Sequence, residues 1–306
     1  MNFDYIHNLT VLDLNVETID CDILNKEDVV SLAEALKVNS SLTVLKLRNN
    51  EISKRTISLA EALKVNSSLT YLDLGFNIIR NEGTEALAEA LKVNSSLTYL
   101  YLCFNQIKEG KALAEALKVN SSLTKLDLRL NYLEKIKALA EALKVNSSLT
   151  WLDLRCNNIE KVEALAEALK VNSSLTKLDL SFNRISEDVE ALAEALKVNS
   201  SLTKLDLRDN KIEDKGAVSL AEALKVNSTL TKLDLRDNKI EDKGAVSLAE
   251  ALKVNSTLTW LNLKGYEIKY EGTSVLAEAL KVNSTLTYLE FTELFHNDEI
   301  EYDEIE

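Results

Sequence analysis

Hydrophobic and polar residues along this chain follow two patterns that recur from one end to the other. In residues 204–208, leucine alternates with charged side chains, which predicts a short β-strand with one apolar face. Further along, Leu220 and Leu224 lie four residues apart among Ala, Glu and Lys, which predicts an amphipathic helix. Asn227 follows, a residue that tolerates the left-handed conformation with which many helices end. Each unit therefore predicts a strand, a loop, a helix and a turn.

The string LAEALKVNS marks these units because it occurs ten times in the chain. Successive copies begin 26–28 residues apart, at Leu32, Leu59, Leu87, Leu113, Leu139, Leu165, Leu192, Leu220, Leu248 and Leu276. Within each copy, Glu and Lys lie three residues apart, as at Glu222 and Lys225, a spacing that predicts a surface ion pair. Residues 203–230 and 231–258 are identical, which indicates a recent duplication. A fixed period of this length predicts one solenoid of stacked units.

The strand and its following loop have the spacing L-x-x-L-x-L-x-x-N-x-I, as in residues 202–212. With the helix that follows, this motif resembles the leucine-rich repeats of ribonuclease-inhibitor type, which also occur in NOD-like receptors and Ran GTPase-activating proteins. The resemblance covers about residues 9–294. It implies an α/β solenoid, or horseshoe, with a parallel β-sheet on the concave face and α-helices on the convex face. Spacing alone predicts the same curvature, because strands stack at about 4.8 Å and packed helices need about 8–10 Å.

The position after the strand is asparagine in eight consecutive units. The resemblance implies that these side chains bond the loop backbone as a structural ladder, formed by Asn50, Asn77, Asn105, Asn131, Asn157, Asn183, Asn210 and Asn238. Towards the ends of the chain the same position holds Glu17, Tyr266 or Leu294. We therefore expect capping segments there, which a solenoid needs where its apolar end would otherwise meet water.

The expected single domain has three parts. Residues 1–31 form an N-terminal cap with the first strand, residues 32–288 form ten helix–strand repeats, and residues 289–306 form a C-terminal cap and an acidic tail. The 26-residue units lack the glycine that other units carry ahead of the helix, at Gly83, Gly216, Gly244 and Gly272. We therefore expect the convex helices of the 26-residue units to begin differently.

The outward-facing strand residues vary between repeats, whereas the helix string hardly changes. The first outward column contains both tryptophans of the protein and consists of Val11, Val44, Tyr71, Tyr99, Lys125, Trp151, Lys177, Lys204, Lys232, Trp260 and Tyr288. The second column is mostly aspartate, and arginine is the commonest residue of the third. Because the variation is confined to one face, we expect function there and a scaffold role for the helices.

Aromatic residues gather on neighbouring strands of this face. We hypothesise that Tyr71, Tyr99, Tyr101 and Trp151 anchor a protein partner, because large rigid rings bury much area at little entropic cost. An alternative is that aromatics simply suit β-strands, and that Phe76, Phe104 and Phe182 at the rim are half-buried in the core. The full expected contact set on the concave face is Tyr71, Tyr99, Tyr101, Trp151, Asp153, Arg155, Lys204, Asp206, Arg208, Trp260 and Tyr288.

Charged rows such as Lys204–Asp206–Arg208 allow two interpretations. They form either a patterned docking surface or, as we favour, a self-neutralising lattice of low energetic value. The neighbouring aspartates also suggest a glycosidase, whose carboxylates lie about 5–5.5 Å apart. However, we expect the flanking cations to lower the pKa values of these carboxyls, whereas a general acid needs a raised pKa.

Catalytic motifs are missing from the sequence. The two histidines, His7 and His296, lie near opposite ends, so the repeats hold no histidine triad and no multi-histidine metal site. Phosphate-loop, dinucleotide and zinc-protease motifs are also absent. We therefore expect a non-enzymatic interaction module without metal or cofactor. The alternatives are a GTPase activator of the Ran type, acting through loop residues such as Asn105 or Arg184, and an amplified repeat scaffold without a specific partner.

Composition bears on location and partners. The net charge is −13, and residues 289–306 hold eight acids without Lys or Arg, so we expect no nucleic-acid binding. No run of 18 apolar residues occurs, and the odd cysteines Cys21, Cys103 and Cys156 fit a reducing compartment, so we expect a cytoplasmic protein without a membrane partner. The repeated N-x-[ST] sequences are expected to be turns rather than glycan sites. Pairing of two copies through the open ends of the solenoid is left open.

Overall fold

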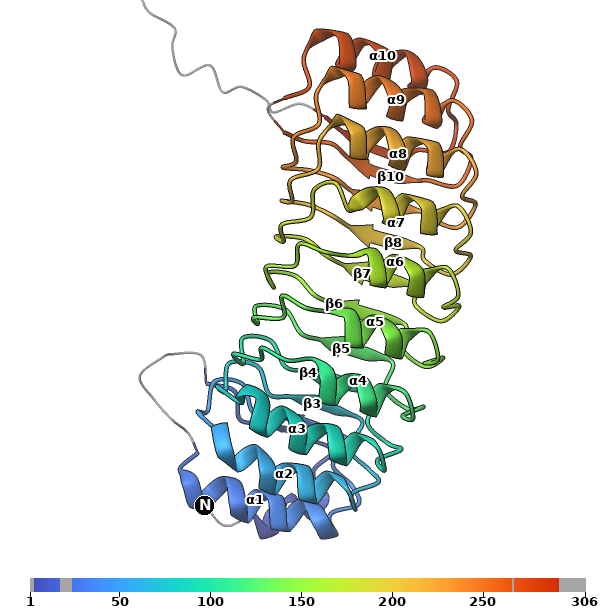
Figure 1. Ribbon diagram of the computed structural model, residues 1–306. Coiled ribbons are helices and arrows are strands. Elements are labelled where there is room, and N and C mark those ends of the chain that lie inside the picture. The colour runs from blue at the N-terminus through green and yellow to red at the C-terminus, as the bar shows by residue number, and fades with distance from the viewer. Residues whose placement is uncertain (1–2, 17–23, 266, 292–306) are drawn as a thin grey trace, which may run out of the picture.

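The computed structural model describes residues 3–16, 24–265 and 267–291 of this chain. These residues form one curved stack in which a continuous sheet lies on one side and a row of helices covers the other (Figure 1). The expected leucine-rich-repeat solenoid is confirmed, with the sheet on the concave side and the helices on the convex side.

Eleven short parallel strands follow one another in the sheet in chain order within the described residues. Their bounds are β1 (Val11–Asp13), β2 (Val44–Lys46), β3 (Tyr71–Asp73), β4 (Tyr99–Tyr101), β5 (Lys125–Asp127), β6 (Trp151–Asp153), β7 (Lys177–Asp179), β8 (Lys204–Asp206), β9 (Lys232–Asp234), β10 (Trp260–Asn262) and β11 (Tyr288–Glu290). The register places equivalent residues of neighbouring repeats opposite each other, for example Tyr71 opposite Tyr99 and Trp151 opposite Lys177. The outward columns that the sequence predicts are therefore continuous in space.

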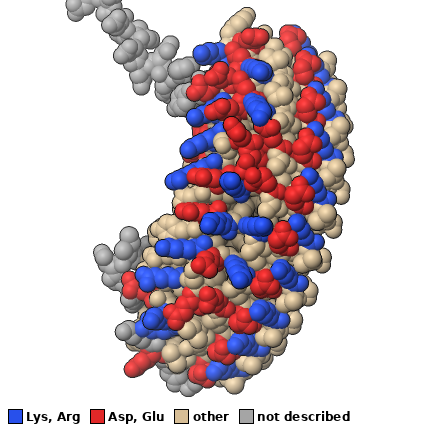
Figure 2. All heavy atoms as spheres, in the orientation of Figure 1, with Lys and Arg blue, Asp and Glu red and all other residues tan. Residues whose placement is uncertain are grey.

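Each α-helix connects two consecutive strands. Their bounds are α1 (Lys26–Val38), α2 (Thr56–Leu63), α3 (Arg80–Leu91), α4 (Lys111–Leu117), α5 (Lys137–Leu143), α6 (Glu163–Leu169), α7 (Val189–Leu196), α8 (Asp214–Leu224), α9 (Asp242–Leu252) and α10 (Tyr270–Leu280). Two 3₁₀ segments, η1 (Asp4–Asn8) and η2 (Ser53–Arg55), precede β1 and α2. The predicted pair of Glu222 and Lys225 forms at 2.6 Å, and its copies place rows of acidic and basic side chains along the helices (Figure 2).

The core between the sheet and the helices is made almost entirely of leucine and alanine. Leu205 and Leu207 of the sheet, and Leu220 and Leu224 of α8, are each at most 1% exposed. The same positions are buried in the neighbouring repeats, so one apolar core runs from Phe3 to Ala279. Burying a leucine contributes about 2 kcal/mol, and each repeat buries several.

The helices of the 26-residue repeats begin differently, as expected, because they start closer to the LAEALKVNS string and are shorter. Helices α4, α5 and α6 have 7 residues each, whereas α8 and α9 have 11. In the longer units a glycine allows the first turn to pack closely, because a Cβ on Gly216 would lie 2.4 Å from Cγ1 of Val189. The 26-residue units omit that turn and therefore do not need the glycine.

The asparagines after the strands form a ladder along one edge of the sheet. Asn77 donates from Nδ2 to the carbonyl oxygens of Leu47 at 2.8 Å and Leu74 at 3.0 Å, and its Oδ1 accepts from the backbone N–H of Asn50 at 2.9 Å. The residues beside these asparagines have left-handed backbones, for example Phe76 with φ 60°. The ladder thus satisfies backbone groups of a sharp turn that cannot pair with each other.

The asparagines that end each helix string form a second ladder, which the sequence analysis missed. The expectation that Asn227 adopts a left-handed backbone is wrong, because positive φ values occur at other residues. Instead, Asn227 is buried, donates from Nδ2 to the carbonyl oxygen of Leu196 at 2.7 Å and accepts from the N–H of Leu230 at 2.8 Å. This ladder closes the turn between helix and strand in every repeat from Asn39 to Asn283.

The division into cap, repeats and tail remains a prediction. Helix α1 begins at Lys26, inside the predicted cap, and β11 crosses the predicted boundary after residue 288. Glu17, Tyr266, Leu294 and residues 292–306 lie outside the described part of the chain. None of the helices in the described part combines the length and apolar character that crossing a bilayer requires.

Candidate protein-binding surface

Four aromatic side chains meet on the concave face over β3, β4 and β6. We refer to Tyr71, Tyr99, Tyr101 and Trp151 as the aromatic cluster. The ring centroids of Tyr71 lie 5.9 Å from Tyr99 and 5.1 Å from Tyr101, and Tyr101 lies 6.2 Å from Trp151. All four side chains are half-buried, so each keeps an exposed part above the leucine layer. These distances are those of mutually supporting rings, which therefore form a pre-arranged apolar surface.

A small-residue position separates the aromatic cluster from the rim of the sheet. Gly75 and Cys103 occupy the column that holds arginine in most other repeats, and Cys103 is 2% exposed. A Cβ on Gly75 would lie 2.7 Å from Sγ of Cys103, so this position is closely packed. Burial raises the pKa of the Cys103 thiol to about 11, which leaves it protonated and unreactive at neutral pH.

Apolar side chains also line the adjacent rim, at the position just before the ladder asparagine. The rings of Phe76 and Phe104 stack with centroids 4.6 Å apart, and the guanidinium of Arg48 lies 4.5 Å from the Phe76 centroid. Phe104 and Phe182 are 46% and 41% exposed, so each keeps a large part of its surface in water at the rim. The rim also includes exposed Leu130, which the sequence analysis did not single out. The sequence feature that could have identified Leu130 is its position in the repeat, because Leu130 and Phe104 each directly precede a ladder asparagine.

Trp260 and Tyr288 form a separate pair. Their rings stack with centroids 4.9 Å apart, and Nζ of Lys232 lies 3.8 Å from the centroid of Trp260. Strands β7, β8 and β9 separate Trp260 from Trp151 in the sheet. The structure therefore divides the predicted contact set into an aromatic cluster, a lysine-bearing middle and a second aromatic pair.

Alternation along the strands predicts that the aspartates of the second column face solvent, but most of them are buried or half-buried. Asp153 is 1% exposed, and Arg155 covers it with Nη2 3.0 Å from Oδ2. Oδ1 of Asp153 also accepts the backbone N–H of Arg155 at 3.0 Å. Asp206 is half-buried and accepts from the backbone of Arg208 in the same way. The aspartates therefore brace the loop and orient the arginines, and they offer a partner little surface.

The expected lowering of the aspartate pKa values is wrong for most of the column, although the hydrogen bond from Lys46 does lower the pKa of Asp13. Burial, together with the charge of neighbouring Asp153, raises the pKa of Asp127 to about 6, although Arg129 acts in the opposite direction. Burial and the charges of Asp179 and Asp234 raise the pKa of Asp206 to about 6. Desolvation of these carboxylates, which disfavours their charged form, outweighs the attraction of the flanking cations.

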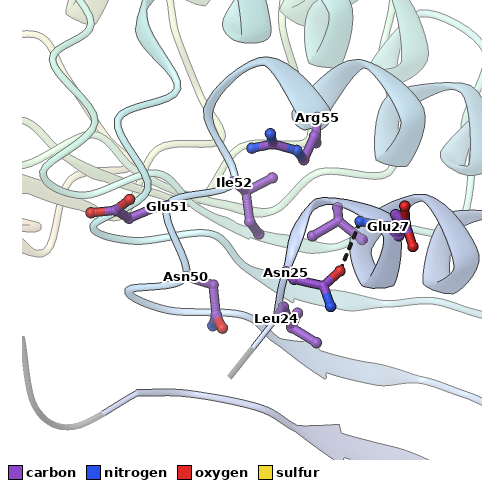
Figure 3. Close-up of a pocket in the computed structure, with 8 residues that line it drawn as sticks. Leu24, Asn25, Glu27, Asn50, Glu51, Ile52 and Arg55 are labelled. Atoms are coloured by element: carbon purple, nitrogen blue, oxygen red, sulfur yellow. Dashed lines mark hydrogen bonds between the residues drawn. The ribbon is translucent and has the colours of Figure 1, made fainter. Parts of the chain in front are cut away.

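Two open pockets lie away from the concave sheet. One of about 1320 Å³ lies on the loops that lead into the shortened helices, and its lining includes Arg80, Lys108 and Tyr132. Another of about 530 Å³ lies between the start of α1 and the loop after β2, where Asn25 caps α1 by accepting from the N–H of Glu27 at 2.9 Å (Figure 3). Within the described part of the chain, no three His, Cys, Asp or Glu side chains are placed to hold a metal ion.

The loop residues considered for GTPase activation differ in accessibility. Asn105 is 0% exposed and its Nδ2 donates to the carbonyl oxygen of Leu74 at 2.8 Å, so it belongs to the first ladder. Arg184 is exposed, with Nη1 3.7 Å from a carboxylate oxygen of Glu160.

Comparison with known proteins supports the repeat assignment. A sequence model of the leucine-rich repeat matches six segments, residues 38–55, 65–88, 145–162, 171–193, 198–221 and 226–249. A search among curated proteins finds no relative with significant similarity.

Solved structures with similar folds include two internalins and a leiomodin. Internalin C2 of Listeria monocytogenes is 26% identical, with 76% of this chain and 84% of that one covered at a TM-score of 0.50. The internalin inlF of the same strain is 18% identical, with 94% and 88% covered at a TM-score of 0.51. A leiomodin-1 structure described as actin-binding site 2 is 24% identical, with 56% and 86% covered at a TM-score of 0.38. Together, the repeated motif, the parallel sheet, the leucine-rich-repeat segments and the internalin matches identify the fold of the chain as a leucine-rich-repeat solenoid.

Proposed function

We propose that this protein is a non-enzymatic interaction module that binds a protein partner on its concave face. Leucine-rich-repeat proteins generally mediate protein–protein interactions, and curved solenoids offer long concave surfaces for them. The main support for the proposal is the aromatic cluster, because its large rings pack against one another and remain partly exposed on the variable face. Such rings are enriched among the residues that dominate binding energy.

The neighbouring rim supports the same assignment. Phe76 and Phe104 extend the apolar surface beside Tyr101, and Gly75 and Cys103 leave no charged side chain between them. Monomeric proteins rarely expose contiguous apolar patches unless another molecule covers them. Arg48 and Arg129 flank this region and supply the polar border that a typical interface has.

The test is capture of partners from native lysate by the immobilised chain and by a Tyr99→Ala/Tyr101→Ala variant. We expect the variant to lose the captured partner while it unfolds at nearly the same denaturant concentration, because the rings lie above the core. The matched control is Val145→Ala/Val171→Ala, which removes exposed apolar side chains from the ends of two helix strings. Equal capture by the Tyr99→Ala/Tyr101→Ala variant and the unmodified chain would contradict the proposal.

A GTPase activator of the Ran type is the second candidate, and only the exposed guanidinium of Arg184 favours it. GTP hydrolysis by small GTPases with and without the protein separates the two functions. We also propose that the repeats are of the ribonuclease-inhibitor type and that the protein is cytoplasmic. An α-helix in every convex segment and the 26–28-residue period support the repeat type.

A further inference from the structure

We propose that the middle of the concave face binds an extended acidic peptide segment that carries aromatic or apolar side chains at its ends. Its contact residues are Lys177, Lys204 and Lys232, which we call the lysine row, and the flanking Trp151 and Trp260. This inference rests on the proposed function and specifies the chemistry of the partner.

Sheet register places the five residues in one line. Trp151 lies opposite Lys177, Lys177 opposite Lys204, Lys204 opposite Lys232, and Lys232 opposite Trp260. Strands lie about 4.8 Å apart, so the lysine row spans about 10 Å and the two tryptophans lie about 19 Å apart. An extended peptide of about six residues covers that distance at about 3.3 Å per residue.

The ammonium groups of Lys177 and Lys204 are available to a partner, whereas Nζ of Lys232 already lies 3.8 Å from the ring centroid of Trp260. Lys177 and Lys204 are exposed, and neither forms an ion pair with any residue that the structure describes. The lysine that ends each helix string behaves differently, since Lys170, Lys197 and Lys225 each bind the glutamate three residues earlier at 2.6 Å. The lysines of the row thus keep a charge that the fold does not neutralise by direct contact.

The surroundings of the row leave its positive charge dominant. On one side, Asp206 and Asp234 are partly or fully buried and accept hydrogen bonds from the backbone of the arginines that follow them. On the other side lie neutral threonines, such as Thr203, whose hydroxyl donates to the carbonyl oxygen of Thr176 at 3.0 Å. Asp209, an exposed acid of the same repeat, lies five residues beyond Lys204, at the rim of the sheet.

The lysine charges and the tryptophan rings together indicate what kind of peptide fits this surface. Like charges directly opposite on neighbouring strands destabilise a sheet, and carboxylates placed over the row relieve that repulsion while forming charge-assisted hydrogen bonds. Trp151 and Trp260 are half-buried at either end of the row. The faces of the Trp260 ring already contact Nζ of Lys232 at 3.8 Å and the stacked ring of Tyr288 at 4.9 Å, so apolar side chains of the ligand pack against Trp151 at one end and against the Trp260–Tyr288 pair at the other. A purely basic or neutral segment has no carboxylates to place over the lysine row, so it does not relieve the repulsion between the lysines.

The experiment uses the full chain and a synthetic peptide of seven residues, with phenylalanine at the first and last positions and glutamate at the third and fifth, so that all four side chains lie on one face of the extended peptide. Fluorescence anisotropy of the labelled peptide gives the affinity. Trp151 and Trp260 are the only two tryptophans of the protein, and both flank the row, so intrinsic emission reports the same event independently. A peptide with glutamine in place of glutamate serves as the ligand control.

The diagnostic variant is Lys177→Gln/Lys204→Gln/Lys232→Gln. Its matched control, Lys170→Gln/Lys197→Gln/Lys225→Gln, removes the same charge from the helices that lead into the same three strands. The second set breaks only exposed pairs, which contribute little to stability. A single Lys204→Gln change provides a milder version of the first set.

We expect the acidic peptide to bind, the row variant to weaken binding by roughly tenfold or more, and added salt to weaken it further. Lys204→Gln should give a smaller loss, and the helix control should bind like the unmodified chain. The inference is overturned if the glutamine peptide binds equally well, or if the helix control loses as much affinity as the row variant.

Two variants distinguish a failure of this inference from a failure of the proposed function. If neutralising the acids of residues 293–306 strengthens peptide binding that still needs the lysine row, the row is supported and the chain's own acidic segment competes for it. If no acidic peptide binds, yet Tyr99→Ala/Tyr101→Ala still abolishes partner capture, the proposed function stands and this inference fails.

Discussion

The side-chain Nδ2 of Asn146 donates to the carbonyl oxygen of Leu117 at 2.8 Å, across 29 residues of sequence. Its Oδ1 accepts from the N–H groups of Ser148 at 3.1 Å and Leu149 at 2.8 Å. One buried side chain therefore joins the end of one helix to the turn of the next repeat. The same arrangement recurs along the stack, so the copied turn is a structural device rather than a simple helix stop.

Asn146→Ala should lower the free energy of unfolding by at least about 2 kcal/mol, because buried backbone donors and acceptors lose their partner. Urea denaturation measures the change. Ser147→Ala is the matched control, since Ser147 is exposed and next in sequence. Asn157→Ala, in the first ladder, should cost a similar amount. A loss below about 0.5 kcal/mol at Asn146 would show that the second ladder is dispensable.

Gly244→Ala should destabilise the protein, although alanine favours a helix by about 1 kcal/mol over glycine. A Cβ at this position would lie 2.7 Å from Oδ1 of Asp214 and 2.9 Å from Cβ of Ala217, in the preceding repeat. Such crowding costs about 1–3 kcal/mol.

Gly265→Ala is the control for Gly244→Ala, because the nearest atoms to its added Cβ lie 3.9 Å away. Thermal or urea unfolding of both variants tests the argument. If Gly244→Ala proves as stable as Gly265→Ala, the close packing of consecutive long helices is not the reason for the glycine.

The sequence was sufficient to predict the fold because the pattern is repeated. Leu205 and Leu207 alternate with charges, and the copies align only as a parallel stack, so strand order and register followed without coordinates. The glycine at Gly216 and its absence from the 26-residue units correctly indicated a different helix start. Each of these predictions depends on the spacing of leucine, charged residues and glycine within one repeat, and this spacing can be read directly from the sequence.

The concave surface was less predictable, because alternation shows on which face of the sheet a side chain lies but not how deeply it is buried. Asp153 alternates as an outward residue, yet Arg155 folds over it and removes it from water. The raised pKa of Asp127 has the same origin, since desolvation depends on neighbours from other repeats. Asn227 was misassigned because its hydrogen-bond partner, Leu196, belongs to the preceding repeat.

Stability should increase as the pH falls from 7 towards 5, through the contribution of Asp127. Its folded pKa of about 6 lies above the ordinary aspartate pKa of 3.8, so the folded state binds the proton more tightly than the unfolded state. The contribution is therefore largest below about pH 4 and is lost as the pH rises through about 6. It amounts to at most about 3 kcal/mol.

Asp127→Asn removes this titration while keeping an oxygen that can accept the backbone N–H of Arg129. Denaturant midpoints of the variant and the unmodified chain, compared between pH 5 and pH 7, isolate its effect from other groups. The variant should show the flatter pH dependence. A steeper dependence in the variant would contradict burial as the cause of the raised pKa.

Cys156 should react with a thiol reagent faster than Cys103. Burial raises both pKa values, but Cys103 is 2% exposed and its pKa reaches about 11, whereas Cys156 is half-buried. Timed alkylation at pH 8 followed by peptide mass spectrometry measures the order. Faster labelling of Cys103 would show that the Gly75–Cys103 position opens in solution and is not the closed surface beside the aromatic cluster.

We propose that the variable concave face, rather than the repeated helices, contacts the partner. A photo-cross-linking residue placed at Tyr99 on the sheet, or at Val171 after helix α6, tests it directly once a partner has been captured. The account predicts a cross-link from position 99 and none from position 171. Cross-linking from position 171 alone would contradict it and would assign binding to the convex side.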